Sequence, residues 1–335
     1  MKKIKVAING FGRIGRAFFK VAKEKEEIEI IAVNELGNKE NMEYLLKYDT
    51  VYGASSYDLK NIKYFSEKDP TKLPWKDLDI DVVVESTGLF ASSEKAQTHI
   101  DAGAKRVVIS APVKDGETVL MGINQEKLKT CIISSNASCT TNAGSPILAI
   151  LDETIGVEKA ILNTIHAYTA SQSLVDSSNK KPARPDDSGR SGGDLREGRS
   201  ASQNIVPSST GAAIAVTKAY PSLEGKFDGI SIRVPVAVGS IADITFISKK
   251  NTTVEEINEI LRGASTAPRW TNIFTITEEP LVSSDIIGNS YASIADLSFT
   301  RVVGGNLVKV LAWYDNEMGY AHTLVRHVIE AGKNI

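Results

Sequence analysis

The sequence predicts a chain of two domains: an α/β domain with a doubly wound, mostly parallel sheet, and an α+β domain with a largely antiparallel sheet. The first prediction rests on short apolar, β-branched runs that alternate with helical or turn segments up to about residue 137. The second rests on the long strand-like runs that follow Gly156. We expect residues 1–137 and 315–335 to form the first domain, to which the C-terminal helix returns, and residues 138–314 to form the second.

The chain opens with a predicted strand at residues 3–9 that runs directly into a glycine-rich turn, Gly10-Phe11-Gly12-Arg13-Ile14-Gly15. A helical stretch follows, and then a strand at residues 28–33 that ends at Asn34-Glu35. In a G-x-G-x-x-G turn the glycines permit a tight turn, close approach of a pyrophosphate, and packing of the helix on the strand. An acid about 20 residues further on can hold the adenosine ribose. The pattern is typical of a Rossmann domain. Because Glu35 would repel the additional phosphate of NADP, we expect the cofactor to be NAD.

Further strands of the first domain are predicted at residues 62–65, 80–85, 106–110, 119–122 and 131–134. Two polar segments, Ser86-Thr87-Gly88 and Ser110-Ala111-Pro112, fall just past the carboxyl ends of two of these strands. Open α/β sheets bind their ligands at that edge. We therefore expect Thr87 and Ser110 to lie near the cofactor.

In the second domain the strand-like runs are residues 160–165, 229–238, 242–248 and 307–313, with a helical segment at 254–261. A polar stretch rich in Ser, Gly, Lys, Arg and Asp predicts a long loop at about residues 170–203. The chain closes with apolar residues at three-to-four spacing, which predicts an amphipathic helix ending at Gly332. His322 and His327 fall on that helix, where we expect structural or exposed positions.

Cys139 follows an apolar strand end and a run of small polar residues, and helical spacing of apolar residues begins shortly after it. We expect it in the first turn of a helix, where unpaired N–H groups and the helix dipole stabilise a thiolate. His166 lies further on and could lower the pKa of this thiol as an imidazolium. The pair predicts nucleophilic catalysis at sulfur, although a lone cysteine is more often a small buried hydrophobe. Pro146 predicts a kink or a short lead-in before the main helix.

The composition excludes several classes of protein. A net charge of −2 gives no general attraction to nucleic acid. No apolar run reaches the roughly 18 residues that a membrane helix needs, and the N-terminus leads into a strand and not a signal peptide, so we expect a cytoplasmic protein. Two cysteines make no disulfide framework, and the 4 scattered histidines predict no metal site.

These segments together resemble the phosphorylating glyceraldehyde-3-phosphate dehydrogenases, from the opening glycine turn almost to the C-terminus. The markers after that turn are Ser135-Asn136-Ala137-Ser138-Cys139-Thr140-Thr141-Asn142, His166-Ala167-Tyr168-Thr169, Pro207-Ser208-Ser209-Thr210-Gly211-Ala212-Ala213, Arg233-Val234-Pro235 and Trp313-Tyr314-Asp315-Asn316-Glu317. The resemblance implies an oxidoreductase of glycolysis, with glyceraldehyde 3-phosphate and inorganic phosphate as its partners. It also implies a homotetramer.

The resemblance further implies that Cys139 attacks the aldehyde to give a hemithioacetal, while His166 orients the thiolate and handles protons. Hydride transfer to NAD then gives a thioester, which inorganic phosphate converts into 1,3-bisphosphoglycerate. The residues implied to bind the substrate or the attacking phosphate are Ser138, Thr140, Thr169, Thr210, Gly211 and Arg233. Those implied to bind NAD are Gly10, Gly12, Arg13, Ile14, Gly15, Glu35, Thr87, Ser110 and Asn316, the last at the nicotinamide carboxamide.

Two features keep alternatives open. The loop at residues 176–203 is about a dozen residues longer than is usual in the family, and Glu197 stands where many bacterial members carry an arginine. An Asn-Glu-Leu segment like that at Glu35 also occurs in erythrose-4-phosphate dehydrogenases, in which water releases the acyl group. That enzyme and a catalytically silent NAD-binding protein are the alternatives. An erythrose-4-phosphate dehydrogenase would differ from the glyceraldehyde enzyme in not needing phosphate. The retention of Cys139 with His166 argues against the catalytically silent protein.

Overall fold

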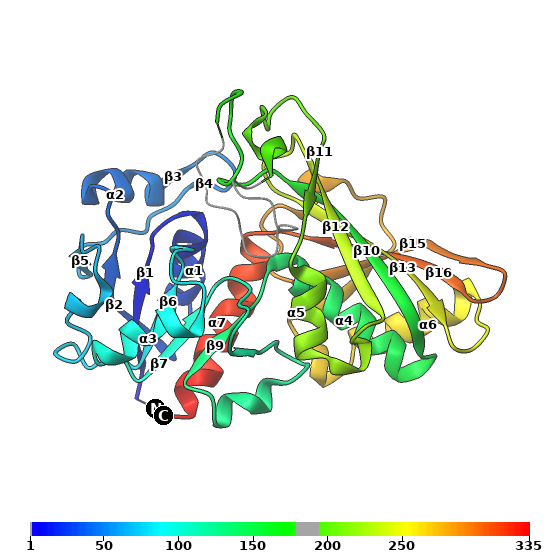
Figure 1. Ribbon diagram of the computed structural model, residues 1–335, viewed down its shortest axis with the longest axis horizontal. Coiled ribbons are helices and arrows are strands. Elements are labelled where there is room, and N and C mark those ends of the chain that lie inside the picture. The colour runs from blue at the N-terminus through cyan, green and yellow to red at the C-terminus, as the bar shows by residue number, and fades with distance from the viewer. Residues whose placement is uncertain (1, 179–193) are drawn as a thin grey trace. The chain divides into compact units, whose positions relative to one another are not determined.

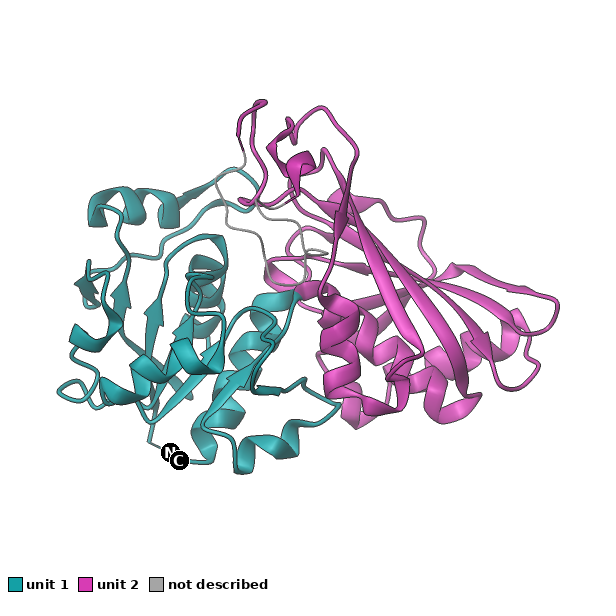
Figure 2. Cartoon of the chain, in the orientation of Figure 1, with its two compact units in different colours: residues 1–138, 320–335 teal, residues 139–319 magenta. Residues whose placement is uncertain are grey.

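The computed structural model describes residues 2–178 and 194–335, and the chain divides into two compact units (Figure 2). The first unit is Met1–Ser138 with Tyr320–Ile335, and the second is Cys139–Gly319. The central part of the long predicted loop, residues 179–193, lies outside the described residues.

The first unit is built on a seven-stranded sheet in the order β5-β2-β1-β6-β7-β9-β8 (Figure 1). Every neighbouring pair in it is parallel, which confirms the predicted doubly wound sheet. Its strands are β1 (Ile4–Asn9), β2 (Ile28–Asn34), β5 (Lys63–Phe65), β6 (Val82–Glu85), β7 (Arg106–Ile109), β8 (Glu117–Thr118) and β9 (Ile133–Ser135). A small hairpin joins β3 (Tyr48–Asp49) to β4 (Gly53–Ala54).

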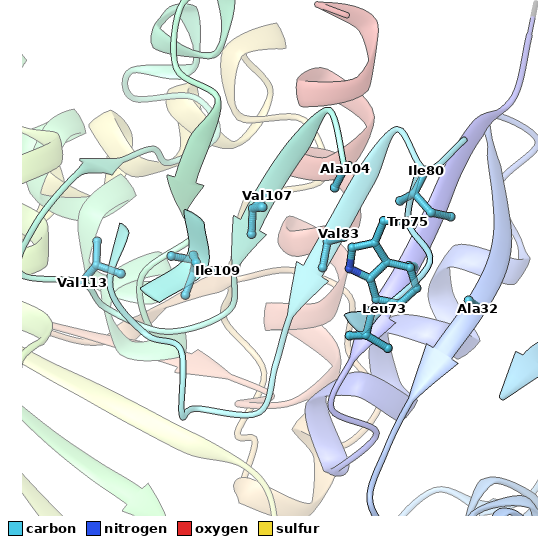
Figure 3. Packing of buried hydrophobic residues seen from close by; sticks show 11 residues of the cluster. Ala32, Leu73, Trp75, Ile80, Val83, Ala104, Val107, Ile109 and Val113 are labelled. Atoms are coloured by element: carbon cyan, nitrogen blue, oxygen red, sulfur yellow. The ribbon is translucent and has the colours of Figure 1, made fainter. Parts of the chain in front are cut away.

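Helices cover both faces of this sheet. They are α1 (Arg13–Lys23), α3 (Ser93–Asp101) and α7 (Met318–Lys333), the last of which belongs to this unit from Tyr320 onward, whereas α2 (Lys39–Lys47) contacts the hairpin strand β3. A cluster of buried apolar residues lies on one face, with α7 behind the strands (Figure 3). Trp75 is its largest member and is fully buried against strand residues such as Val83 and Val107. Because helices bury both faces of this sheet, its short strands carry apolar side chains on both faces.

The second unit contains a seven-stranded mixed sheet in the order β11-β12-β10-β13-β16-β15-β14. Four of its six neighbouring pairs are antiparallel, as expected. Its strands are β10 (Val157–Ala167), β11 (Val206–Ser209), β12 (Phe227–Val234), β13 (Ser240–Ser248), β14 (Phe274–Thr277), β15 (Ser293–Val303) and β16 (Leu307–Tyr314). The helices α4 (Cys139–Thr154), α5 (Ala212–Ala219) and α6 (Val254–Ser265) cover one face of this sheet (Figure 1). A Cβ at Gly144 would lie 3.0 Å from Leu162 Cδ1, so α4 packs closely on β10.

Two predicted strands are wrong in their extent. Residues 119–122 form no strand, because the Asn124 side chain accepts from Leu120 N–H and donates to Thr118 O, and turns the chain there. The run predicted at 229–238 ends at Val234, since Pro235 has no N–H for a ladder bond.

The helix that carries Cys139 begins at this residue and continues through Pro146 as one element. No separate lead-in precedes it, contrary to one of the two expectations from Pro146. Pro146 has no backbone N–H, so it donates no hydrogen bond within this helix. The rest of the helix is held by packing, since ten of its residues from Asn142 to Leu151 are buried.

Among residues 2–178 and 194–335, no helix combines the length and the apolar character needed to cross a bilayer.

His327 is fully buried on α7 and bonds two residues at the end of β9. Its Nδ1 lies 3.1 Å from Asn136 Oδ1, and its Nε2 lies 2.8 Å from Ser134 Oγ. Burial lowers the pKa of His327 from 6.5 to about 3. The imidazole is therefore neutral at pH 7, with a proton on the nitrogen that faces the amide oxygen.

The unfolded chain takes up a proton at this position below pH 6.5, whereas the folded chain does not until about pH 3. Stability is therefore fully present above pH 6.5 and is lost as the pH falls. We expect His327 alone to lower the free energy of unfolding by ~2 kcal/mol between pH 7 and pH 5. Urea unfolding of the parent chain and of His327→Asn at both pH values measures this. The free energy of unfolding of the variant should be lower than that of the parent at pH 7, but it should fall less between pH 7 and pH 5. An equal fall in both chains would contradict the assignment.

Candidate active site

Cys139 and His166 meet in the second unit. Cys139 is the first residue of α4, and its Sγ lies 3.3 Å from Nε2 of His166, near the end of β10. The other ring nitrogen, Nδ1, lies 2.6 Å from the carbonyl oxygen of Ala167. Because a carbonyl only accepts, Nδ1 carries the proton of the neutral imidazole. Nε2 is then free to accept the proton of the Cys139 thiol.

The charge state of this pair differs from the sequence-based expectation. Burial raises the pKa of the Cys139 thiol, although Arg233 and hydrogen bonds from Thr140 lower it. Burial and the Arg233 charge together lower the pKa of His166 from 6.5 to about 3. The expected lowering of the thiol pKa by an imidazolium was wrong, because desolvation penalises both charged forms. At pH 7 the pair is a thiol beside a neutral imidazole, ready for proton transfer.

Arg233 lies on β12 directly opposite His166 in the β10–β12 register. Its positive charge acts on the pKa of both Cys139 and His166, so the three side chains form one site. A fixed cation beside a nucleophile suits an anionic substrate, since a guanidinium grips phosphate oxygens in a two-pronged way.

The remaining predicted phosphate ligands of this unit lie at turns. Thr169 follows β10, where its N–H donates to Gln172 Oε1 at 3.3 Å and its hydroxyl lies 2.8 Å from Ser171 Oγ. Thr210 and Gly211 join β11 to α5, and the Thr210 hydroxyl accepts from Ala212 N–H at 3.2 Å. Ser138 ends the first unit as the residue before Cys139.

Tyr314 is a site residue that the sequence did not single out. Its hydroxyl lies 2.9 Å from Thr140 Oγ1 and 2.7 Å from Thr164 Oγ1, and its ring meets His166 edge-on with centroids 5.9 Å apart. Burial raises the pKa of Tyr314, so its hydroxyl stays protonated. Thr140, predicted to bind phosphate, has its hydroxyl in this contact with Tyr314 and is 4% exposed. Tyr314 thus supports both the first turn of α4 and the imidazole.

In the first unit the glycine turn is closed on one side and open on the other. Gly10 has φ of +93°, and a Cβ there would lie 2.6 Å from Thr87 N, while a Cβ at Gly15 would lie 2.2 Å from Gly10 O. Around a Cβ at Gly12 the structure has nothing within 4 Å among its described residues. The turn therefore fits a dinucleotide, with room for a pyrophosphate at the start of α1.

Arg13 lies within this turn, and Glu35 contacts it. Glu35 Oε2, predicted to hold a ribose hydroxyl, accepts from Phe11 N–H at 2.7 Å, which holds the carboxylate beside the glycine turn. Arg13 bonds both carboxylate oxygens of Asp49 at 3.2 and 3.3 Å and thereby ties the β3–β4 hairpin to the start of α1. Ile14 lies in the first turn of the same helix.

A buried polar network beneath this edge was also missed. Glu85, at the end of β6, accepts from the Thr87 N–H at 2.8 Å and from the Thr87 hydroxyl, and its other oxygen lies 3.1 Å from His99 Nε2. The indole of Trp75 donates to His99 Nδ1 at 3.1 Å. Since an indole only donates, His99 carries its proton on Nε2 and donates it to Glu85. The carboxylate thus fixes Thr87, and the Glu85 carbonyl accepts from Ser110 N–H.

Asn316, the predicted partner of the nicotinamide, follows β16 and is 5% exposed. Glu197 lies in the one-turn helix Leu195–Gly198, where Ser208 Oγ is 3.4 Å from its Oε1.

Comparisons with known proteins agree with these two units. Residues 4–93 match the family model of the glyceraldehyde 3-phosphate dehydrogenase NAD binding domain, and residues 138–316 match that of the C-terminal domain. The chain is 41% identical over 347 residues to glyceraldehyde-3-phosphate dehydrogenase 2 of Streptomyces avermitilis, with 99% of each chain covered. It is 43% identical over 338 residues to glyceraldehyde-3-phosphate dehydrogenase of Clostridium acetobutylicum, with 96% of each covered. The Streptomyces coelicolor enzyme of the same name is 42% identical over 347 residues, again with 99% of each covered. The chain therefore belongs to the glyceraldehyde-3-phosphate dehydrogenase family.

Proposed function

We propose that this chain catalyses the NAD-dependent oxidative phosphorylation of D-glyceraldehyde 3-phosphate to 1,3-bisphosphoglycerate. The observation that carries the proposal is the contact of 3.3 Å between Cys139 Sγ and His166 Nε2 beside the cation of Arg233. An activatable thiol, a neutral base and a phosphate-binding cation are what the oxidation of a phosphorylated aldehyde through a thioester requires. The names of the relatives, at 41 to 43% identity, support the same substrate.

NAD supplies the hydride acceptor when it is bound. We assign its pyrophosphate to Gly10, Gly12, Arg13, Ile14 and Gly15, and its adenosine ribose to Glu35. Thr87 and Ser110, both tied to Glu85, line the same edge of the sheet, and Asn316 takes the nicotinamide carboxamide. The close contacts at Gly10 and Gly15 and the open space at Gly12 support this assignment.

In the first step the Cys139 thiol gives its proton to His166 Nε2 as the sulfur attacks the aldehyde carbon. The hemithioacetal oxygen then takes that proton, and the Cys139 backbone N–H at the head of α4 stabilises its negative charge as it develops. His166 accepts the hydroxyl proton again as the hydride departs, and a thioester to Cys139 remains.

In the second step inorganic phosphate attacks the thioester carbon, and Cys139 leaves as a thiolate. The thiolate takes back the proton held by His166 Nε2, which restores the thiol and the neutral imidazole. We assign the substrate phosphate to Thr169 and Arg233, and the attacking phosphate to Ser138, Thr140, Thr210 and Gly211. The fixed cation of Arg233 also favours the departing thiolate, since its charge lowers the pKa of Cys139.

The proposal is tested by the requirement for phosphate. NADH formation from glyceraldehyde 3-phosphate should rise at least tenfold when inorganic phosphate or arsenate is added, because both are oxyanions that can take the acyl group. The measurement is the initial rate at 340 nm, with sulfate as the ionic-strength control.

Erythrose 4-phosphate in parallel assays separates the alternative enzyme, in which water releases the acyl group. A rate with glyceraldehyde 3-phosphate that is independent of phosphate would contradict the proposal. A preference for erythrose 4-phosphate under the same conditions would favour the hydrolytic alternative.

We further propose that the chain acts as a homotetramer in the cytoplasm. The support for self-association is the face of the second sheet opposite α4, where Ile161 and Ile230 are 56% and 51% exposed on neighbouring strands. Apolar side chains grouped on a sheet face indicate a protein interface. The size of the particle in solution, measured by light scattering, tests this assignment.

A further inference from the structure

The Asn316 side chain is held in one orientation by two donors. Gly239 N–H and Ser240 Oγ both lie 3.1 Å from the same atom of its carboxamide. A backbone N–H only donates, so this atom must be the oxygen. The amide nitrogen is thereby turned away from both groups and has no hydrogen-bond acceptor within residues 2–178 and 194–335.

Ser240 donates its single hydroxyl proton to Asn316. The Ser240 oxygen accepts from Ala167 N–H at 3.1 Å, so its hydroxyl hydrogen is the one donated to Asn316 Oδ1. The residue is 1% exposed and therefore has no water to replace either bond. A buried hydroxyl with one donor and one acceptor in place fixes both partners.

The same hydroxyl connects Asn316 with the catalytic base. Ala167, whose N–H meets Ser240, offers its carbonyl to His166 Nδ1 at 2.6 Å. The peptide unit after His166 and the amide of Asn316 are thus joined through one atom, Ser240 Oγ. Gly239 has φ of +96°, and a Cβ there would lie 2.4 Å from Ser283 O, so this donor position requires glycine.

We propose that Ser240 is a positioning residue that sets the orientation of the Asn316 amide, and with it the face of the nicotinamide ring that receives the hydride. This inference rests on the proposed function. With the oxygen of Asn316 occupied, only its NH₂ group can meet the cofactor, and it can bond only the carbonyl of the nicotinamide carboxamide. Without Ser240 the amide can rotate by half a turn, since a single remaining N–H from Gly239 has to hold it.

The test compares Ser240→Ala with Ser240→Thr, which keeps a hydroxyl, and with Ser293→Ala. Ser293 is the matched control, because it is also fully buried on a strand but its hydroxyl has no hydrogen-bond partner among the described residues. Two properties are measured. One is the Kd of NAD by calorimetry, and the other is the configuration at C4 of NADH formed from 1-deuterated aldehyde, read by proton NMR.

Ser240→Ala should weaken NAD binding by about 5- to 10-fold, which is the usual effect of losing one hydrogen bond. It should also give a detectable second diastereomer of the deuterated NADH, which a merely structural loss would not produce. Ser293→Ala should match the parent in both properties, and Ser240→Thr should restore a single diastereomer. Parent-like binding and a single diastereomer in Ser240→Ala would overturn the inference.

The calorimetric measurement keeps this result separate from the proposed function. If the parent chain binds NAD but forms no NADH from either aldehyde phosphate, the proposed function fails. The role of Ser240 is then tested only by the ratio of the Kd of NAD for Ser240→Ala to that for the parent chain.

Discussion

Replacing Cys139 with alanine should abolish dehydrogenase turnover, with a loss of at least ~10⁴-fold. The reason is that the proposed scheme passes through a covalent bond to this sulfur. The second cysteine, Cys131, lies in the first unit before β9. The measurement is the steady-state rate of NADH formation with aldehyde and phosphate at saturation.

Cys131→Ala is the matched control for this experiment. Both cysteines are half-buried and free of disulfides, and burial raises the pKa of each. Only Cys139 faces an imidazole and heads a helix. Cys131→Ala should keep the parent rate, and rapid quenching of the parent with aldehyde and NAD should leave an acyl group on the peptide that contains Cys139. Undiminished turnover of Cys139→Ala would falsify the covalent scheme, whereas loss of NAD binding in that variant would point to misfolding.

The parts of this site that the sequence predicted are those that depend on neighbouring residues. The turn from Gly10 to Gly15 follows from a local steric requirement, and the contacts at 2.6 and 2.2 Å explain why glycine is needed at both ends. The position of Cys139 at a helix start likewise follows from the residues next to it. Such features can be predicted because the relevant contacts form within a few residues of the motif.

The parts that were missed join residues that are far apart in the sequence. Tyr314 meets Thr140 across 174 positions and Thr164 across 150, and no periodicity connects them. His99 and Trp75 are 24 positions apart, and their bond depends on the sheet that brings α3 to the core. Without a packed structure, each of these residues looks like an ordinary core or surface side chain.

The charge state of the thiol could not be predicted for a related reason. The helix start and the imidazole, both of which favour a thiolate, are visible in the sequence. The cost of burying the charge is not, because it depends on every atom packed around the sulfur. In the structure this cost is the largest influence on the pKa of Cys139 and of His166.

Replacing His166 with asparagine should lower turnover by roughly 10²- to 10⁴-fold, because the variant loses the acceptor for the thiol proton. The pKa of His166 at about 3 means that the imidazole is neutral and able to accept throughout the range from pH 6 to pH 9. Titration of His166 should therefore contribute little to the pH dependence of the parent rate in this range. In the variant solvent must take the proton from a thiol whose pKa burial has raised, so the rate should climb by close to tenfold per pH unit.

The comparison of pH profiles separates a chemical role of His166 from a structural one. Tyr314→Phe is the matched control, because it keeps the ring that packs edge-on against His166 and removes only the hydroxyl bonded to Thr140 and Thr164. It should reduce turnover by no more than about tenfold, the effect of one lost hydrogen bond, and should retain the flat profile of the parent. If His166→Asn also kept a flat profile at its reduced rate, the imidazole would act by holding Cys139 in place. Proton transfer to Nε2 would then have to be withdrawn from the mechanism, because a variant that lacks the base should have a rate that rises with pH.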